Sequence, residues 1–163
     1  MFANIVLALT AVTTALMAGL FYAYSFSVSP GLGRLADAEY IRAMQHINRA
    51  ILNPVFYAGF MGTLLLLPFS AYLHYGQPLS VRFWCLAAAA LVYAVGVFGI
   101  TMAVNVPLNE ALNAFNTEPA SLSEIAARRA GFEVRWNTFN NLRTLFAVVA
   151  TALVAVGCIY KEG

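Results

Sequence analysis

Residues 83–109 read FWCLAAAALVYAVGVFGITMAVNVPLN, an apolar run that contains no Lys, Arg, Asp or Glu. A bilayer core about 30 Å thick is crossed by roughly 20 apolar residues of helix, so this run predicts a transmembrane helix over about 83–104. The run ends in two asparagines that flank Pro107. The stretch therefore predicts both a membrane span and a group of polar side chains at one of its ends.

Three other runs lack charged residues and predict three further spans. These spans are expected at about 5–28, 54–72 and 142–160. The 163 residues are 61% hydrophobic and 10% charged, whereas a typical soluble domain is about 25% charged. Because four spans and three connections account for the length, residues 1–163 are expected to form one domain. We predict an all-α integral membrane protein: a four-helix up-down bundle with amphipathic helical segments in its first and third connections.

The basic residues predict an orientation. Seven arginines lie in or beside the two long connections: Arg34, Arg42, Arg49, Arg128, Arg129, Arg135 and Arg143. Only Arg82 and Lys161 lie on the other side of the predicted membrane. By the positive-inside rule, the long connections are expected to be cytoplasmic, in the cytoplasmic membrane if the source is bacterial. No basic run is typical of a nucleic-acid-binding surface, so no nucleic-acid partner is expected.

The first long connection has the pattern of an amphipathic helix. A helix is expected from Asp37, acting as its N-cap, to about Leu52. On a helical wheel, Asn48 falls beside the apolar stripe and His46 falls opposite it. Asn48 is therefore the polar residue expected to face inward. The pair Asn53-Pro54, a cap residue followed by a first-turn proline, marks the start of the second span.

The third connection repeats this design. Ser121 and Glu124 fit a capping box, which predicts a helical segment through about residue 137 that leads into the fourth span. Several large or polar side chains project from one sector of this helix: Ile125, Phe132, Trp136, Phe139 and Arg143, with Asn140 beside them. An arginine and an asparagine thus continue an aromatic stripe.

Small residues are expected to bring the spans together. Ala11, Ala15 and Gly19 recur at four-residue spacing in the first span, and the third span carries Gly96 and Gly99. Small side chains let transmembrane helices approach closely. Both stripes therefore predict helix contacts inside the bundle.

Polar side chains gather where the four antiparallel spans meet one membrane face. The candidate site residues at that face are Tyr22, Tyr24, Asn48, Asn105, Asn109, Glu110, Trp136, Asn140 and Arg143. An unpaired amide is costly in hydrocarbon, so this concentration predicts a shared polar cavity or network. Glu110 and Arg143 are the opposite charges placed to meet there. The alternative is that the asparagines cap helices, Arg143 reaches toward the interface, and Trp136 joins an aromatic belt.

Metal and hydrolase chemistry find little support. The two histidines, His46 and His74, are expected on opposite membrane faces, and no set of metal ligands converges. We therefore expect no metal. A hydrolase needs a nucleophile beside a base, and nothing in the spacing of Ser25 and His46 indicates such a pair.

Several motifs resemble those of the anthrone oxygenase-like family of small four-span membrane proteins. They are Tyr22-Ala23-Tyr24-Ser25-Phe26 with Pro30, Met44-Gln45, Asn48-Arg49-Ala50-Ile51-Leu52-Asn53-Pro54, Asn105-Val106-Pro107-Leu108-Asn109, and Trp136 with Asn140 and Arg143-Thr144. The resemblance extends over nearly the whole chain.

The resemblance implies a membrane-embedded oxygenase. The expected reaction oxidises an anthrone-like or other activated phenolic aromatic with O₂ as co-substrate and without a metal or organic cofactor. The residues that it implies as catalytic are Glu110 as base and Asn105, Asn109 and Arg143 as oxyanion donors. The residues that it implies for substrate binding are Asn48, Trp136, Asn140, Tyr22 and Tyr24. The expected partners are membrane lipid and a hydrophobic aromatic small molecule.

A non-catalytic function is the alternative. The polar cavity would then bind a lipid, a quinone-like molecule or a partner subunit, or stabilise a homo-oligomer. A transporter is disfavoured, because one short bundle lacks the paired repeats and broken helices that alternating access requires.

Overall fold

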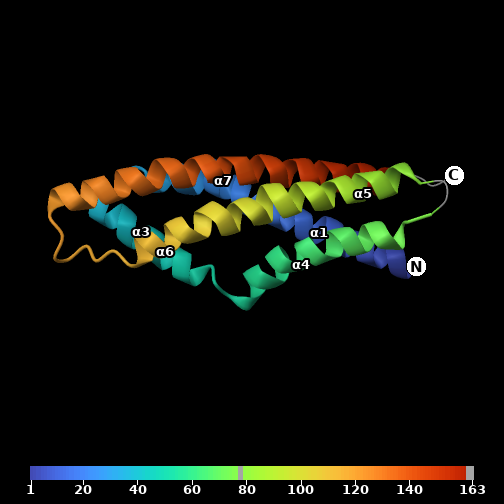
Figure 1. Ribbon diagram of the computed structural model, residues 1–163, viewed down its shortest axis with the longest axis horizontal. Helices are drawn as coiled ribbons and strands as arrows, with labels where there is room; N and C mark the ends of the chain where they lie inside the picture. The colour runs from blue at the N-terminus through green and yellow to red at the C-terminus, as the bar shows by residue number, and fades with distance from the viewer. Residues whose placement is uncertain (77–78, 161–163) are drawn as a thin grey trace.

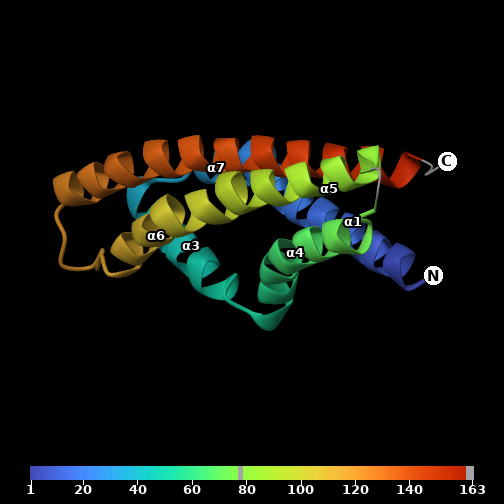
Figure 2. The same ribbon diagram turned by 45° about the vertical axis from the view of Figure 1, so that its right-hand side comes forward.

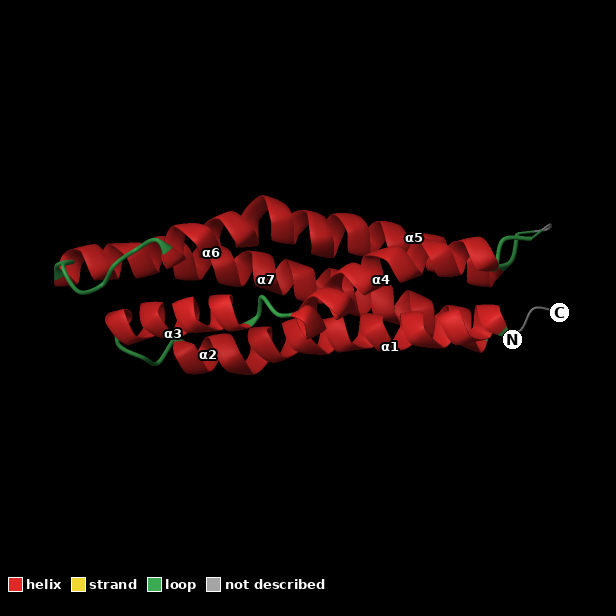
Figure 3. Ribbon diagram, turned by 90° about the horizontal axis from the view of Figure 1, so that it is seen from below, coloured by secondary structure: helices red, strands yellow, loops and turns green. Residues whose placement is uncertain are grey.

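The computed structural model describes residues 1–76 and 79–160, and these form an elongated bundle of helices (Figure 1). No strand occurs in these two ranges. In chain order the elements are α1 Phe2–Ala23, a π-helical segment Tyr24–Val28, α2 Ser29–Leu32, α3 Asp37–Ala50, α4 Pro54–Leu73, α5 Val81–Val92, π-helical segments Tyr93–Gly99 and Thr101–Asn105, α6 Val106–Asn113, and α7 Leu122–Ile159. Loops occupy little of the described chain (Figure 3). The predicted all-α class is confirmed.

Four continuous helices are long and apolar enough to cross a membrane. They are Phe2–Leu32, Pro54–Leu73, Val81–Asn113 and Leu122–Ile159. The start of α1 and the end of α7 lie at the same end of the molecule (Figure 1). The chain is therefore an integral membrane protein with an up-down arrangement of its spans.

The spans pack around an apolar core. Helix α1 contacts α4 and α7, and α5 contacts the same two helices. Leu67, Leu86 and Ala147 are fully buried between them. Large apolar side chains also cover the outside of the bundle: Leu9, Leu16, Leu65, Leu91, Val95 and Leu145 are exposed. A protein in lipid can have an apolar exterior as well as an apolar core, because an apolar side chain avoids water equally well inside the protein and against lipid tails.

The helix of the third span extends beyond the predicted span 83–104 and continues to Asn113. The predicted segment that leads into the fourth span is confirmed, since it joins that span in one continuous helix, Leu122–Ile159. Pro107 does not interrupt the helix of the third span, since it lies in the first turn of α6. The π-helical segment before it accommodates the ring: the N–H of Val106 donates to the carbonyl of Thr101, five residues back. The wider turn takes up the clash that proline imposes on an α-helix, so the helix continues.

Helix α3, α6 and the first half of α7 form a second core at one end of the bundle. Tyr40, Met44, Leu112 and Phe132 are buried there. Figure 2 shows that α3 and α4 diverge from a bend that projects from the side of the bundle. The bend is set by Asn53, whose side chain accepts from the N–H of Phe56 at 3.0 Å, as the sequence predicts.

The predicted capping box is confirmed, and the predicted N-cap of α3 is wrong. The Ser121 hydroxyl accepts from the N–H of Glu124, whose carboxylate accepts from the N–H of Ser121. In α3 the N-cap is Ala36, without a side-chain bond. Asp37 lies inside the helix because its carboxylate is held by an arginine of α7 instead of by the α3 backbone.

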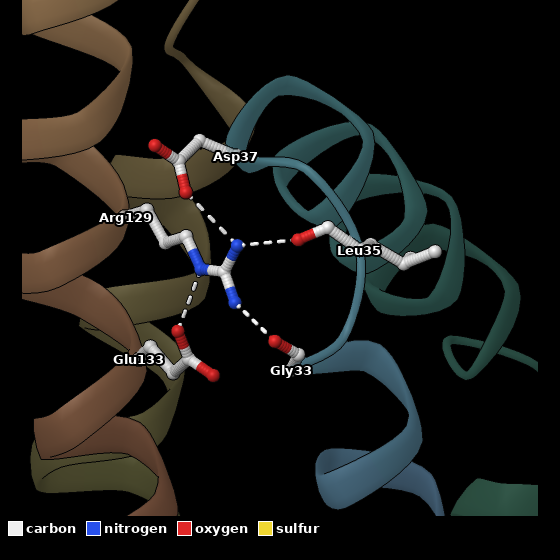
Figure 4. A network of polar contacts seen from close by, with 5 residues as sticks. All are labelled: Gly33, Leu35, Asp37, Arg129 and Glu133. Atoms are coloured by element: carbon white, nitrogen blue, oxygen red, sulfur yellow. Dashed lines mark hydrogen bonds and ion pairs between the residues drawn. The ribbon is translucent and has the colours of Figure 1, made fainter.

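That arginine is Arg129, which joins the loop before α3 to α7 (Figure 4). Its guanidinium donates to the carbonyls of Gly33 at 2.8 Å and Leu35 at 2.7 Å. It also donates to the carboxylates of Asp37 at 2.9 Å and Glu133 at 2.7 Å. These charge-assisted hydrogen bonds to four acceptors fix α3 against α7. They thereby also fix the position of Asn48, which lies on α3.

Arg129→Gln is expected to lower the free energy of unfolding by about 2 kcal/mol, because it removes several hydrogen bonds of a charged donor. Arg128→Gln is the matched control, since Arg128 is exposed and stacks only on the ring of Phe115, at 5.0 Å. Thermal unfolding of both variants in detergent micelles tests this. Equal melting temperatures would show that the Arg129 contacts contribute nothing.

Only one of the two small-residue stripes meets a neighbouring helix as predicted. A Cβ added at Gly96 would overlap the ring of Phe146 on α7. In the first span, however, Ala15 and Gly19 are exposed, and a Cβ at Gly19 would meet nothing within 4 Å. The expectation is therefore wrong for Ala15 and Gly19, whereas Ala11 is partly buried against the core. The inward face of α1 includes Thr14.

Gly96→Ala is expected to destabilise the bundle by about 1–3 kcal/mol, the usual cost of overpacking. Gly62→Ala is the control, since a Cβ there meets nothing within 4 Å, and removing a helical glycine adds stability of about 0.5–1 kcal/mol. Thermal unfolding reports both changes. Adding Phe146→Leu to Gly96→Ala should restore part of the loss, and no restoration would contradict the proposed clash.

Candidate functional site

A small cavity of about 90 Å³ lies between the two cores. Seven of the predicted site residues line it: Tyr24, Asn48, Asn105, Asn109, Trp136, Asn140 and Arg143. The remaining lining is apolar except for Thr101: Leu20, Phe21, Ile47, Ile51, Leu52, Phe56 and Val106. Four separate stretches of the chain thus bring their polar side chains to one place.

Helical spacing explains how each stretch aims its residues. Asn105 and Asn109 are four residues apart, so they lie one above the other on one face. Trp136, Asn140 and Arg143 follow the spacing i, i+4, i+7 on α7 and share a face in the same way.

Helix α3 contributes its inward polar residue. Asn48 is only 5% exposed and lines the cavity, whereas His46 is exposed. This is the arrangement that the helical wheel predicts.

Arg143 is a buried cation that has no carboxylate partner among residues 1–76 and 79–160. It is 6% exposed and donates to Thr101 Oγ1 at 3.2 Å and to Asn140 Oδ1 at 2.8 Å. The rings of Phe21 and Trp136 lie 4.7 Å and 5.6 Å from its guanidinium carbon. Neutral acceptors and ring faces stabilise a cation less than an ion pair does, so its charge remains largely uncompensated.

A chain of hydrogen bonds orients Asn140 toward Arg143. The amide nitrogen of Asn140 donates to Ser25 Oγ at 2.9 Å, and Ser25 shares a second hydrogen bond with Thr144 at 2.8 Å. Because the amide nitrogen bonds to Ser25 in the π-helical segment after α1, the amide oxygen faces the guanidinium.

The indole of Trp136 is held in a similar way. Its Nε1 donates to Asn109 Oδ1 at 2.8 Å. The ring of Tyr24 lies 5.7 Å from the indole, centroid to centroid. These two rings form an aromatic wall of the cavity.

Several polar atoms of the lining have no hydrogen-bond partner. They are Asn48 Nδ2, Asn105 Nδ2, Asn105 Oδ1 and Arg143 Nε. Each such group costs about 1–3 kcal/mol when buried. Because they lie around one cavity, a bound molecule or ordered water would satisfy several of them at once.

Two predicted residues do not join the cavity. Tyr22 is 54% exposed and its ring lies 4.6 Å from that of Phe26. Two residues of helix turn a side chain by about 200°, so Tyr22 points away from the cavity when Tyr24 points into it. Glu110 is exposed, about 100° around α6 from Asn109. The predicted meeting of Glu110 with Arg143 does not occur.

Sequence reasoning missed Thr101 and Phe21. Thr101 precedes Asn105 by four residues and Phe21 precedes Tyr24 by three, so helical spacing from the predicted residues would have indicated both. Ser25 is not among the predicted site residues either, and its hydrogen bond to Asn140 joins residues 115 positions apart in the chain. No local pattern indicates such a pair.

Metal ligands do not cluster in the described part of the chain. No group of three or more His, Cys, Asp or Glu side chains is placed to hold a metal ion there. His74 lies outside the cavity, and its Nδ1 is 2.8 Å from the carbonyl oxygen of Ser70.

A larger groove of about 530 Å³ lies between α6 and the start of α7. Its lining includes Phe115, Arg128 and Arg135, and none of the predicted site residues. The smaller cavity is the stronger candidate site, because its polar groups are buried and incompletely bonded, whereas Arg128 and Arg135 are exposed to solvent.

Comparison with known proteins gives one match. A family model described as anthrone oxygenase matches residues 54–153, which is more than half of the chain. This region contains Asn105, Asn109 and the three site residues of α7, and it excludes α1 and α3. No curated protein and no solved structure is similar enough to the chain to count as a match.

Proposed function

The chain belongs to the anthrone oxygenase family, and from this premise we propose that it oxidises an anthrone-like or other activated phenolic aromatic with O₂. The reaction uses no metal or organic cofactor, and O₂ is the co-substrate. One observation carries the proposal: the uncompensated cation of Arg143 lies beside unbonded amides and aromatic rings in a single cavity. Such a site suits a flat ring that carries negative charge on oxygen.

The chemistry balances with O₂ alone. In an anthrone, the methylene carbon becomes a carbonyl, one oxygen atom enters the product, and the other leaves as water. Loss of a proton from the methylene gives an enolate whose charge lies largely on the oxygen of the ketone, and this anion is the reductant of O₂. The protein therefore has to bind and stabilise an oxyanion, which is the task of preorganised donors in a dry cavity.

Each of the seven predicted site residues that line the cavity has a role in this reaction. Arg143, Asn48 and Asn105 donate to the oxyanion, and Trp136 and Tyr24 flank the ring. Two further residues act by positioning. Asn140 orients Arg143 through its 2.8 Å bond, and Asn109 holds the indole of Trp136.

The cavity has to open to admit such a substrate. Its volume of about 90 Å³ is below the roughly 300–1,000 Å³ of typical ligand pockets. Leu52, which lines it, is 59% exposed, and Phe56 beside it is half-buried. Rotation of these two side chains at the bend between α3 and α4 enlarges the cavity toward the outside of the bundle. A hydrophobic aromatic dissolved in membrane lipid enters there.

The site is proposed to lie at the cytoplasmic face. Arg42, Arg129 and Arg143 donate hydrogen bonds to other residues of the protein. Four further arginines remain near that end: Arg34, Arg49, Arg128 and Arg135. Their excess over Arg82 and Lys161 follows the positive-inside rule. In a bacterial cell the long connections then face the cytoplasm.

Oxygen uptake tests the proposed function. Purified protein in lipid nanodiscs, stripped of metals with a chelator, is mixed with anthrone while dissolved O₂ and anthraquinone absorbance are recorded. We expect one O₂ consumed per anthraquinone formed, at a rate above that of empty nanodiscs. Activity that disappears on stripping and returns with iron or copper would contradict the cofactor-free reaction. No activity under any condition would favour the non-catalytic binding function.

A further inference from the structure

The cavity carries a positive charge that no described residue balances. Arg143 is its one charged lining residue. The partners of the guanidinium are a threonine hydroxyl, an asparagine carbonyl and two aromatic rings. A lone buried cation is costly, since water no longer solvates it and no anion replaces that solvation. The site as it stands lacks one negative charge.

The unbonded atoms around this charge are mostly donors. Three N–H groups have no partner: Asn48 Nδ2, Asn105 Nδ2 and Arg143 Nε. One acceptor, Asn105 Oδ1, is also without a partner. These residues are 5%, 1% and 6% exposed, in that order, so solvent does not compensate them. An oxygen anion accepts several N–H bonds at once, and a neighbouring hydroxyl of the same ligand satisfies the remaining carbonyl.

The lining contains no base that could form this anion in place. It includes no Asp, Glu, His or Lys, and its one other titratable group is the phenol of Tyr24. His46 and Arg49 of α3, Tyr57 of α4 and Glu110 of α6 are exposed and do not line the cavity. Five less exposed titratable residues of the neighbouring elements do not line it either: Asp37, Tyr40, Tyr93, Arg129 and Glu133. A proton lost by the ligand therefore passes to solvent.

We propose that the cavity binds its substrate as an aromatic oxyanion, formed by loss of a proton to solvent and held by Arg143, Asn48 and Asn105, without a protein base. The substrate class is a planar phenol or enol with an acidic O–H and a second hydroxyl beside it. This inference rests on the proposed function, because it names the ionisation state in which the substrate of that reaction is bound.

A product-like probe tests binding without turnover. The visible absorption of 1,8-dihydroxyanthraquinone changes when it loses a proton, and this probe cannot repeat the oxidation. Its titration is recorded in nanodiscs with and without the protein. We expect the bound probe to ionise at least one pH unit lower than in empty nanodiscs, a tenfold change in its ionisation constant.

Three variants test whether Arg143 causes the shift in the ionisation of the probe. Arg143→Gln should abolish the shift, and Arg143→Lys should keep part of it, since the charge remains without the planar fork. Arg135→Gln is the matched control, because Arg135 is exposed and does not line this cavity. A wild-type protein that does not bind the probe, or that binds it with an unshifted titration, overturns the proposal. An equal shift in Arg143→Gln also overturns it.

Turnover on the wild-type protein gives a second test that needs no variant. Without a protein base, the pH profile of the initial rate should follow the acidity of the substrate, so more acidic anthrones should reach their plateau at lower pH. A plateau at one pH for all anthrones would indicate a protein base and overturn the proposal. Loss of turnover in Glu110→Gln would identify that base.

The outcomes separate this inference from the proposed function. A shifted probe titration without oxygen uptake means that the anion site is real and the oxygenase function is wrong. Oxygen uptake with an unshifted probe titration means that the oxygenase function is real and the anion site is wrong.

Discussion

Arg143→Gln is expected to lower anthrone turnover about 10²–10³-fold, the usual effect of removing an oxyanion donor from a preorganised site. Arg143→Lys should also lower turnover strongly, because an ammonium keeps the charge but cannot donate from a planar fork to Thr101, Asn140 and a ligand together. The arginine makes the first two of these bonds at 3.2 Å and 2.8 Å.

The measurement is oxygen uptake at saturating anthrone, with Arg135→Gln as the matched loss of an exposed arginine. Thermal unfolding of the same preparations checks the fold. Because no described carboxylate would lose its ion-pair partner, the loss of Arg143 should not lower the melting temperature greatly. Full activity in Arg143→Gln would remove the central residue of the site.

Asn105→Leu should change stability and activity in opposite directions. Both amide atoms of Asn105 lack partners and the residue is 1% exposed. A leucine of similar size removes a desolvation cost of about 1–3 kcal/mol, and each kcal/mol raises the melting temperature of a chain of this length by about 2–4 °C. The same change deletes a donor to the oxyanion, so turnover should fall at least about tenfold, which corresponds to roughly 1.4 kcal/mol of lost transition-state binding.

Asn141→Leu is the control for this variant, since Asn141 is an exposed asparagine of α7 that does not line the cavity. It should alter neither the melting temperature nor turnover beyond small surface effects. A lower melting temperature in Asn105→Leu would mean that ordered water already satisfies the amide. Asn105 would then be a structural residue and not a ligand-binding one.

Much of the fold could be predicted from local pattern. Four charge-free runs predict four spans, because the bilayer thickness sets the length of an apolar helix. Asn53 and Ser121 cap their helices as predicted, since a cap depends on residues only three positions away. The inward position of Asn48 follows from the same short-range periodicity.

Long-range packing produced the departures from these predictions. The helix continues through Pro107 because the wider turn of the π-helical segment before it relieves the steric clash of the proline ring. No residue pattern indicates that segment. Asp37 is not the N-cap of α3 because Arg129, 92 residues away in the chain, binds its carboxylate. Gly19 faces outward although its spacing favoured a helix contact.

The candidate site was also predictable from the sequence only in part. Sequence placed the asparagines, Trp136 and Arg143 at one membrane face, because span direction alone brings those chain positions together. It could not choose between neighbours such as Tyr22 and Tyr24, since both lie at the same depth and differ only in rotation about the helix axis.

The sequence by itself determined that the chain spans a membrane four times and which residues reach the polar end of the bundle, because apolar length and helical period are local properties. The tertiary structure alone decided that Arg143 has no acidic partner in the described part of the chain and that Glu110 lies outside the cavity. It also decided that Thr101 and Phe21 complete the surroundings of the guanidinium. These facts depend on the rotation of each helix about its axis. That rotation is set by packing against three other helices, such as the contact of Gly96 with Phe146.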